Sequence, residues 1–399
     1  MKDVFVIDIT RTAVGKFGGT LASVRPDDLA AEVIKSIVAR NPQIDYSEVD
    51  EVIFGAANQA GEDNRNVARM ASLLAGIPET VPGYTVNRLC ASGLQSIQNG
   101  YMAIKSGEAN LIIAGGTESM TRAPFVLAKA ETAYSRTPEI HDTTIGWRFT
   151  NKTLSKLHHP FSMGETAENV AEKFNISRER QDQFAYESQL KWQQAHERGD
   201  FRNEITPIII PQKKKDPIVF QTDEHPRLST PDVLATLSPA FRANGSVTAG
   251  NSSGINDGAA CCLLASEDMV KKYNLTPMAR IVSFGTAGVD PAIMGIGPVP
   301  ATQKALQKAG LSIDQLDIME LNEAFASQVL ASIDLLKADP SKVNLNGGSI
   351  AIGHPLGASG TRISATLLHQ MNRNKSLKYG LATMCIGVGQ GSAIIFENC

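Results

Sequence analysis

The sequence predicts an α/β protein of two similar halves separated by an inserted segment. Three observations lead to this fold class. Short apolar strands alternate with helical stretches, one order of motifs occurs twice, and a polar, proline-containing region lies between the two copies. Alternating strands and helices indicate βαβ units around a mostly parallel sheet, so each copy is expected to form one such unit.

The repeat relates the two ends of the chain. Asp50 and Asp317 each precede a strand-like segment, and Ala91-Ser92-Gly93 recurs as Ala358-Ser359-Gly360. Both pairs lie 267 positions apart (317 − 50 and 358 − 91). Because repeats of this kind mark a duplicated structural unit, we expect the two copies to pack together as similar halves.

The repeat also divides the chain into parts. We expect an N-terminal half at 1–118, a loop domain at 119–250 and a C-terminal half at 251–399, with the alternative that 251–275 completes the N-terminal half. An insertion this long is more typical of a functional covering region than of a linker. Helical patterns are found at Pro26 to Ala39, Glu165 to Phe174, Arg178 to Arg198 and Ala301 to Ala309.

Composition excludes several classes of protein. With 42% hydrophobic residues in a chain of 399, a large core can form, and a formal net charge of −3 argues against a general nucleic-acid surface. No apolar stretch approaches the roughly 20 residues of a membrane span, and residues 1–7 resemble a first strand, which predicts a cytoplasmic location. Lys213-Lys214-Lys215 is expected to be a solvated loop, with attraction of an anionic ligand as the alternative.

The cysteines indicate thiol chemistry rather than cross-links. There are five, without framework spacing, so disulfides are not expected. No CxxC or paired Cys/His motif is present, so we expect no metal. Cys261 and Cys262 lie in an apolar run typical of a buried strand, and Cys399 is terminal. Cys90 and Cys385 remain as candidates for chemistry.

Cys90 lies where an apolar strand gives way to small residues and then to a helical pattern. A thiol at a helix N-terminus is expected to be shifted towards the thiolate, which is the nucleophilic form. Taken alone, this context fits a small structural cysteine better than a nucleophile. The functional interpretation therefore depends on what the second copy brings to Cys90.

The second copy brings a histidine and another cysteine. His354 is bracketed by glycines, at a place quasi-equivalent to that of Cys90, and Cys385 lies in a further glycine-rich turn. Glycines let the backbone come close to a ligand. We expect His354 to draw Cys90 towards the thiolate, and the two thiols to divide nucleophilic and acid/base duties.

Two other segments are candidates for binding. Asn322 and Glu323 follow a strand at the carboxyl-end edge where α/β sheets gather ligands, although helix capping would explain Asn322 equally well. The stretch 249–259 is dense in small polar residues. It fits either a plain loop or the wall of a narrow polar ligand site.

Together these segments resemble the signatures of the thiolase family. Five separate motifs match in order and spacing from one end of the chain to the other, whereas Cys-Ala-Ser-Gly alone would be a weak match. The resemblance implies two duplicated five-layered halves (αβαβα) with an inserted loop domain, assembled as a homodimer or homotetramer. The motifs are Asn87 to Gly93, Gly250 to Ala259, Asn322 to Phe325, Gly353 to Gly357 and Cys385 to Gly391.

The resemblance also implies roles for single residues. Cys90 takes the acyl group, His354 activates Cys90 and holds the thioester oxygen, and Cys385 moves the proton on the acetyl carbon. Asn322 holds a water in one oxyanion site, while the backbone N–H groups of Cys90 and Gly387 form another. Coenzyme A is then a co-substrate, with no permanently bound cofactor. Residues expected to contact substrate or coenzyme A are Ser253, Ala249, Arg227, Met163, Phe241, Phe325 and Arg148.

Only the inserted region indicates which acyl chain the substrate carries. Residues 128–130, 135–136, 142–149 and 162–171 resemble 3-oxoadipyl-CoA thiolases of aromatic-compound breakdown, although Gly164 stands where many of these have proline. We predict cleavage of 3-oxoadipyl-CoA to succinyl-CoA and acetyl-CoA, with acetoacetyl-CoA or another 3-ketoacyl-CoA as the alternative substrate. Because a dicarboxylic chain needs a cation for its far carboxylate, Arg148 is a candidate, with a structural arginine as the alternative.

Two rival classes share the fold. A catalytically silent acyl-CoA or lipid carrier would keep the groove and lose the reactive groups, but Cys90, His354 and Cys385 are all present. A decarboxylating ketosynthase uses two histidines, or a histidine and an asparagine, around its cysteine. Here Asn322 and His354 are accompanied by a second cysteine.

Overall fold

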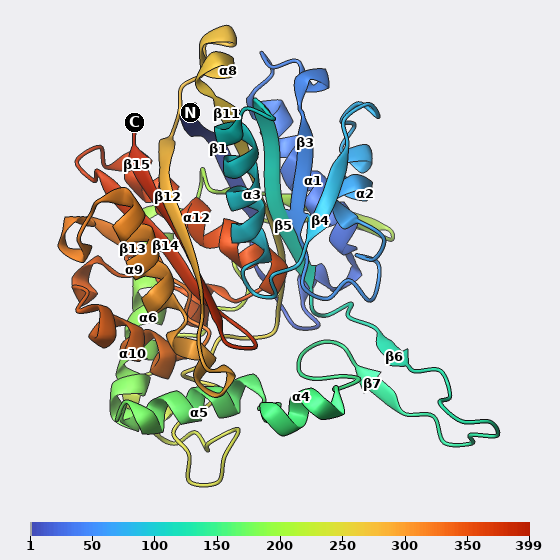
Figure 1. Ribbon diagram of the computed structural model, residues 1–399, viewed down its shortest axis with the longest axis vertical. Coiled ribbons are helices and arrows are strands. Elements are labelled where there is room, and N and C mark those ends of the chain that lie inside the picture. The colour runs from blue at the N-terminus through green and yellow to red at the C-terminus, as the bar shows by residue number, and fades with distance from the viewer. Residues whose placement is uncertain (1) are drawn as a thin grey trace.

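The computed structural model describes residues 2–399, and its centre is an 11-stranded sheet (Figure 1). The main path runs β13-β14-β15-β12-β1-β11-β5-β3-β4, and β1 joins β12 through two residue pairs, Phe5 with Arg280 and Val6 with Ala279. The strands on this path are β1 (Val4–Thr12), β3 (Glu51–Gly55), β4 (Gly83–Val86), β5 (Leu111–Ser119), β11 (Asn256–Ser266), β12 (Ala279–Gly288), β13 (Ile318–Leu321), β14 (Tyr379–Ile386) and β15 (Gln390–Asn398).

The two sides of this junction repeat one topology. From β1 outwards the pairings are antiparallel with β11, antiparallel with β5, then parallel with β3 and β4. From β12 outwards the same order holds through β15, β14 and β13, and a bridge between Met319 and Val343 takes the place of the last strand. The expectation of a mostly parallel sheet was wrong, because β11 and β15 return antiparallel to the strands before them.

Hydrogen bonds confirm the duplication at the level of single residues. The Asp50 carboxylate accepts from the backbone N–H groups of Asn110 and Leu111, at 2.6 and 3.0 Å. The Asp317 carboxylate accepts in the same way from Lys378 and Tyr379, at 2.7 and 2.9 Å. Each aspartate thus fixes the start of the neighbouring strand, β5 in one half and β14 in the other.

Three apolar clusters separate the layers. The central cluster contains Leu94 of α3 and Leu367 of α12, which pack between the two sides of the sheet. A second cluster lies under α1 and α2, and a third lies under α9 and α10. The five-layered fold of two halves is therefore confirmed. The helices are α1 (Pro26–Arg40), α2 (Val67–Leu74), α3 (Ser92–Ser106), α8 (Glu267–Lys272), α9 (Pro298–Ala309), α10 (Ala326–Leu336), α11 (Ser349–Ile352) and α12 (Leu356–Arg373).

The inserted region lies between β5 and β11, where the second half has only a tight turn between β14 and β15. Its β6–β7 hairpin projects from the body of the molecule (Figure 1). Helix α6 has the predicted bounds, while α5 begins two residues early because Ser162 forms a capping box with Glu165. Its elements are β6 (Phe125–Leu127), β7 (Ile140–Asp142), α4 (Lys152–Leu157), α5 (Met163–Lys173), α6 (Arg178–Arg198), β8 (Ile205–Thr206), β9 (Ile208–Gln212), β10 (Lys215–Phe220) and α7 (Pro231–Ala235); β2 (Gly15–Lys16) pairs with β11.

A buried ion cluster attaches the inserted region to the core. Arg11 of β1 binds Glu204 at 2.5 Å and Asp223 at 2.6 Å, and all three side chains are inaccessible to solvent. Breaking one partner of such a buried set leaves an uncompensated charge, so the cluster holds the insertion in place. The exposed residues 213–215 lie at the β9–β10 hairpin.

The domain boundaries at 118 and 250 stay a prediction. Strand β11 lies between β1 and β5, which supports the alternative that 251–275 completes the N-terminal half. In the part of the chain that the structure describes, no helix combines the length and apolar character of a membrane span.

The starts of α3 and α12 touch through their backbones. A Cβ at Gly360 would lie 2.2 Å from the Leu94 nitrogen, and one at Gly93 would lie 2.7 Å from the Gly357 oxygen. Thr361 Oγ1 donates to the Gly93 carbonyl at 2.9 Å, which fixes this contact. These glycines belong to the two copies of the Ala-Ser-Gly motif, so the repeated motif is the place where the halves meet.

Replacing Gly360 with alanine should therefore destabilise the fold. We expect Gly360→Ala to lower the free energy of unfolding by about 1–3 kcal/mol, because backbone cannot move aside as a flexible side chain can. Denaturant unfolding measures this. Gly288→Ala is the matched control, since its Cβ would meet nothing closer than 3.8 Å. Equal stability of the two variants would contradict the close packing.

Candidate active site

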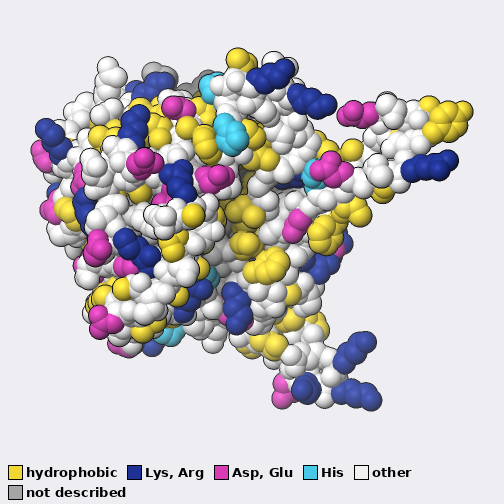
Figure 2. All heavy atoms as spheres, turned by 90° about the horizontal axis from the view of Figure 1, so that it is seen from below, with side chains coloured by type: hydrophobic (Ala, Val, Ile, Leu, Met, Phe, Trp, Pro, Cys, Tyr) yellow, Lys and Arg dark blue, Asp and Glu magenta, His cyan; other side chains and the backbone are white. Residues whose placement is uncertain are grey.

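A cavity of about 330 Å³ opens beside Cys90. On the face that carries the inserted region, apolar side chains gather around a hollow (Figure 2). Both halves and the insertion contribute to the cavity, which is lined by Ala57, Asn58, Leu89, Cys90, Glu118, Thr143, Thr144, Ile145, Gly146, Trp147, Arg148, Met163, Leu356, Gly387 and Val388.

Cys90 lies between β4 and α3, two residues before the helix begins at Ser92. The preceding Leu89 has φ 48°, in the left-handed region that is costly for a leucine. The expected lowering of the thiol pKa was wrong: burial raises the pKa of Cys90 to about 11, and the Glu118 charge adds to the rise. Backbone N–H groups of Gly387 and of Cys90 itself offset part of this effect. Desolvation thus outweighs the helix end, and the resting thiol stays protonated.

His354 lies in the turn between α11 and α12. Its Nδ1 is 2.6 Å from Ser359 Oγ, and Ser359 Oγ donates to the Pro355 carbonyl at 2.8 Å. Because the serine proton is used on that carbonyl, Nδ1 must carry the proton and donate to Ser359. The lone pair of the imidazole then lies on Nε2, where it can accept a proton.

Asn322, which follows β13, faces that Nε2. Its Nδ2 lies 3.4 Å from His354 Nε2, while its Oδ1 accepts from Ser349 Oγ at 2.6 Å. Arg362 donates to the same oxygen at 3.5 Å, so the amide orientation is fixed. Burial, followed by the positive charge of Arg362, lowers the pKa of His354 to about 3. The resting imidazole is therefore neutral, so it does not draw Cys90 towards the thiolate by its charge as expected from the sequence.

Cys385 lies at the end of β14 and is buried. Burial raises the pKa of its thiol, and the nearby Cys90 adds to the rise, so the two sulfurs lie in one site. It packs in a small apolar cluster that includes Met163 and Phe325. All five cysteines are free thiols.

Glu118, at the end of β5, is a buried carboxyl that sequence reasoning did not identify. Its oxygens accept from the backbone N–H groups of Ala57, Asn58 and Gly357 at 2.8, 3.1 and 2.8 Å. It thereby joins the first half to the start of α12. Burial raises the pKa of Glu118 to about 7 despite these donors. A Cβ at Gly357 would lie 2.8 Å from its Oε2.

The expected coenzyme A residues fall in two places. Met163 lines the Cys90 cavity, whereas Arg227 and Ala249 line a separate cavity of about 210 Å³. Arg227 donates to the Ala249 carbonyl, which leaves part of its guanidinium for a ligand. Ser253, whose N–H donates to the Ala324 carbonyl at 3.0 Å, is in the lining of neither cavity.

Two aromatic residues expected to contact substrate or coenzyme A pack against each other. Phe241 and Phe325 meet edge to face, with ring centroids 6.1 Å apart. Gly164 packs against the Phe241 ring, where an added Cβ would come within 2.1 Å.

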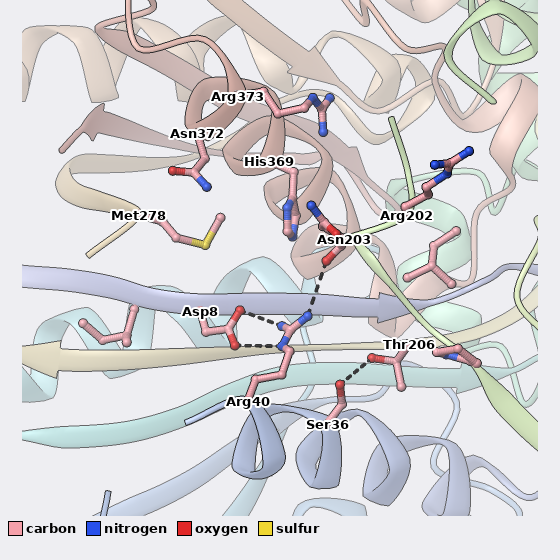
Figure 3. Close-up of a pocket in the computed structure, with 13 residues that line it drawn as sticks. Asp8, Ser36, Arg40, Arg202, Asn203, Thr206, Met278, His369, Asn372 and Arg373 are labelled. Carbon is pink, nitrogen blue, oxygen red and sulfur yellow. Dashed lines mark hydrogen bonds and ion pairs between the residues drawn. The ribbon is translucent and has the colours of Figure 1, made fainter. Parts of the chain in front are cut away.

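A larger cavity, of about 520 Å³, lies away from Cys90 (Figure 3). Among the described residues that line it there is no cysteine, and the carboxylate of Asp8 already binds Arg40 at 2.6 and 2.9 Å. His369 uses Nε2 on the Ile9 carbonyl at 2.9 Å. The cavity at Cys90 therefore remains the candidate for the reactive site. Within residues 2–399, no cluster of three or more His, Cys, Asp or Glu side chains is arranged to hold a metal.

Two family profiles match the sequence of the chain that forms this duplicated α/β fold. Residues 4–268 match the thiolase N-terminal domain, and residues 275–398 match the thiolase C-terminal domain. The chain belongs to the thiolase family, whose members are acyltransferases.

Particular relatives are similar over their whole length. The chain is 54% identical to the beta-ketoadipyl-CoA thiolase of Acinetobacter baylyi, covering 100% of both chains. It is 53% identical to the 3-oxoadipyl-CoA/3-oxo-5,6-dehydrosuberyl-CoA thiolase of Escherichia coli, again covering 100% of both. Human mitochondrial 3-ketoacyl-CoA thiolase in complex with CoA superimposes with a TM-score of 0.92, at 43% identity over 100% of this chain and 98% of that chain.

The hydrogen bond to Ser359 should control the reactivity of Cys90. We expect Ser359→Ala to slow alkylation of Cys90 by iodoacetamide about tenfold at neutral pH, because the lost bond frees the imidazole to place its proton on Nε2. Mass spectrometry of the modified peptide gives the rate. Ser364→Ala is the control, since Ser364 is also buried in α12 and bonds only the Gly360 carbonyl. The same rate in both variants would exclude tautomer control.

Proposed function

We propose that this chain uses coenzyme A to cleave 3-oxoadipyl-CoA into succinyl-CoA and acetyl-CoA. The observation that carries the proposal is a cavity lined by Cys90 and by Leu356, two residues after His354. Two further relations support it: Cys385 lies close enough to Cys90 for the pKa of its thiol to be raised, and Asn322 Nδ2 lies 3.4 Å from His354 Nε2. The substrate is supported by the full-length similarity to relatives that are named for it.

The first stage acylates Cys90. The thiol gives its proton to His354 Nε2, and the sulfur attacks the 3-oxo carbon to form a tetrahedral alkoxide. The backbone N–H groups of Cys90 and Gly387 and a water on Asn322 supply the two oxyanion sites. When the bond between C2 and C3 breaks, acetyl-CoA leaves as an enolate, and the Cys385 thiol protonates its carbon.

The second stage releases the acyl group. The Cys385 thiolate takes the proton of free coenzyme A, whose sulfur attacks the acyl-Cys90 thioester. The tetrahedral intermediate collapses to succinyl-CoA, and the Cys90 sulfur recovers its proton from His354. Since both stages use only protein groups and coenzyme A, the proposal needs no permanently bound cofactor.

The coenzyme A arm is proposed to be held by Arg227, Ala249 and Ser253, alongside Met163, Phe241 and Phe325. The cytoplasm stays the predicted location.

We further propose that the chain forms a homodimer or a homotetramer. Strand β4 pairs only with β3 among the described strands, and Tyr84 of β4 is 37% exposed. Helix α2, which packs against β4, carries the exposed Leu74. An edge strand with apolar neighbours favours pairing with a second copy. The projecting β6–β7 hairpin, with Phe125 74% exposed, would suit a second, tetramer-forming contact.

Replacing Cys90 and replacing Cys385 should affect the steps of the reaction differently. We expect Cys90→Ala to lose at least roughly 1,000-fold in cleavage of 3-oxoadipyl-CoA, because it removes the nucleophile. Cys385→Ala should stop deuterium exchange into the methyl group of acetyl-CoA and should slow, without abolishing, formation of acyl-Cys90 from succinyl-CoA, because Cys385 also exchanges a proton with coenzyme A in the second stage. Product release by chromatography, exchange by NMR and acylation by mass spectrometry measure these steps. Cys399→Ala is the control; full activity of Cys90→Ala would refute the mechanism.

Assembly can be tested by sedimentation. We expect the wild type to sediment as a dimer or tetramer, and Leu74→Asp to shift it towards smaller species, because a buried aspartate opposes association. A deletion of the hairpin tip should convert a tetramer to a dimer and leave a dimer unchanged. A monomeric wild type at micromolar concentration would contradict the proposal.

A further inference from the structure

One cation lines the cavity beside Cys90. Among the described residues that line it, Arg148 is the only lysine or arginine, and the others are mostly apolar or small. We propose that Arg148 binds the terminal carboxylate of the acyl chain and so selects dicarboxylic over monocarboxylic 3-oxoacyl-CoA. This inference rests on the proposed function and names the residue that gives it its substrate class.

The position of Arg148 suits contact with the far end of a short acyl chain attached to Cys90. Cys90, Leu89, Gly387 and Val388 form one wall of the cavity, and residues 143–148 of the inserted region form another. An acyl group attached to Cys90 therefore extends into a space that the guanidinium also borders. The reacting carbon lies at the core wall, and the cation lies on the covering segment.

Asn58 holds the covering segment and orients Arg148. Its Nδ2 donates to the Thr143 carbonyl and to Thr143 Oγ1, both at 3.1 Å. Because both donors of the amide are used there, Oδ1 must face the other way, and it accepts from Arg148 Nη2 at 3.4 Å. The Asn58 N–H donates to the Glu118 carboxylate, so Asn58 attaches the covering segment to the core. The guanidinium is thus placed before any ligand arrives.

The charge of Arg148 is not used within the described chain. No Asp or Glu carboxylate of residues 2–399 lies within 4.0 Å of it, and its one side-chain partner is the neutral Asn58 amide at a long distance. Arg122 and Arg11, by contrast, each bind carboxylates. A guanidinium has five N–H donors in a planar fork, which matches a carboxylate with two parallel bonds. Arg148 therefore has free donors for one.

The other ionisable group in the cavity favours the same arrangement. Glu118 is saturated by three backbone N–H groups and lies on the core side. In its ionised form Glu118 disfavours a substrate carboxylate near the thiol and favours one at the opposite wall, beside Arg148. Ile145 and Trp147 add apolar surface beside Arg148 in the cavity lining.

A matched pair of substrates isolates this contact. 3-Oxoadipyl-CoA and 3-oxohexanoyl-CoA have acyl chains of the same length and differ only in ending with a carboxylate or a methyl group. We expect Arg148→Gln to lower kcat/KM for 3-oxoadipyl-CoA roughly 10- to 100-fold, the usual effect of losing a charge-assisted hydrogen bond. The value for 3-oxohexanoyl-CoA should change by no more than about twofold, which also reports that the variant is folded.

Further variants separate charge from structure. Arg148→Lys should recover part of the loss, since it keeps the charge without the fork. Lys156→Gln, which removes an exposed cation on α4 of the same inserted region, is the control and should leave both substrates unchanged. Product inhibition gives an independent measurement: Arg148→Gln should weaken inhibition by succinyl-CoA and leave inhibition by butyryl-CoA unchanged.

The outcomes distinguish this inference from the proposed function. A wild type that does not cleave 3-oxoadipyl-CoA, or that prefers 3-oxohexanoyl-CoA, overturns the proposed substrate and with it the inference. A wild type that prefers 3-oxoadipyl-CoA, combined with equal losses or no loss for the two substrates in Arg148→Gln, overturns the inference alone.

Discussion

The close contact between the starts of α3 and α12 is the constraint on which the site depends. Gly93 and Gly360 let the two backbones approach to a distance that a single Cβ would prevent. Cys90 lies just before one helix and His354 just before the other. Cys90 and His354 are brought to the same junction because two helices of different halves begin side by side, and the central apolar cluster then holds those helices between the sheets.

Burial determines the protonation states of Cys90 and His354 in the resting site. In an exposed pair, a cysteine and a histidine can exchange a proton to give two charges, but here desolvation raises the pKa of Cys90 and lowers that of His354. Arg362, buried behind Asn322, further disfavours an imidazolium. The Cys90 thiol and the His354 imidazole are therefore both uncharged in the resting site. Negative charge would form only during the reaction, beside backbone N–H groups that can donate to it. This suits chemistry in which an alkoxide and an enolate arise in turn.

Much of the fold and the core of the site follow from the sequence, because repeats and glycine-rich motifs are local patterns. The two Asp-strand units and the two Ala-Ser-Gly motifs predicted the pairing of halves, and hence the meeting of Cys90 with the second copy. The direction of the Cys90 pKa could not be predicted, since it depends on how much water the folded site excludes. Glu118 was missed for a similar reason: its three donors come from segments around positions 57 and 357, which only the fold brings together. Ser359 was visible as a motif residue, but its bond to His354 depends on the first turn of α12.

The contact between Glu118 and Gly357 bears on how the two copies diverged. Position 357 corresponds to Cys90 in the repeat, at the same 267-residue offset as the other equivalent positions (357 − 90). A side chain there would collide with Glu118 and with the Thr117 carbonyl, 2.6 Å from the added Cβ. With Glu118 in place, position 357 has no room for a nucleophilic side chain. The two halves therefore share a topology without sharing a reactive thiol at this repeat position, and the asymmetry rests on one carboxylate of the first half.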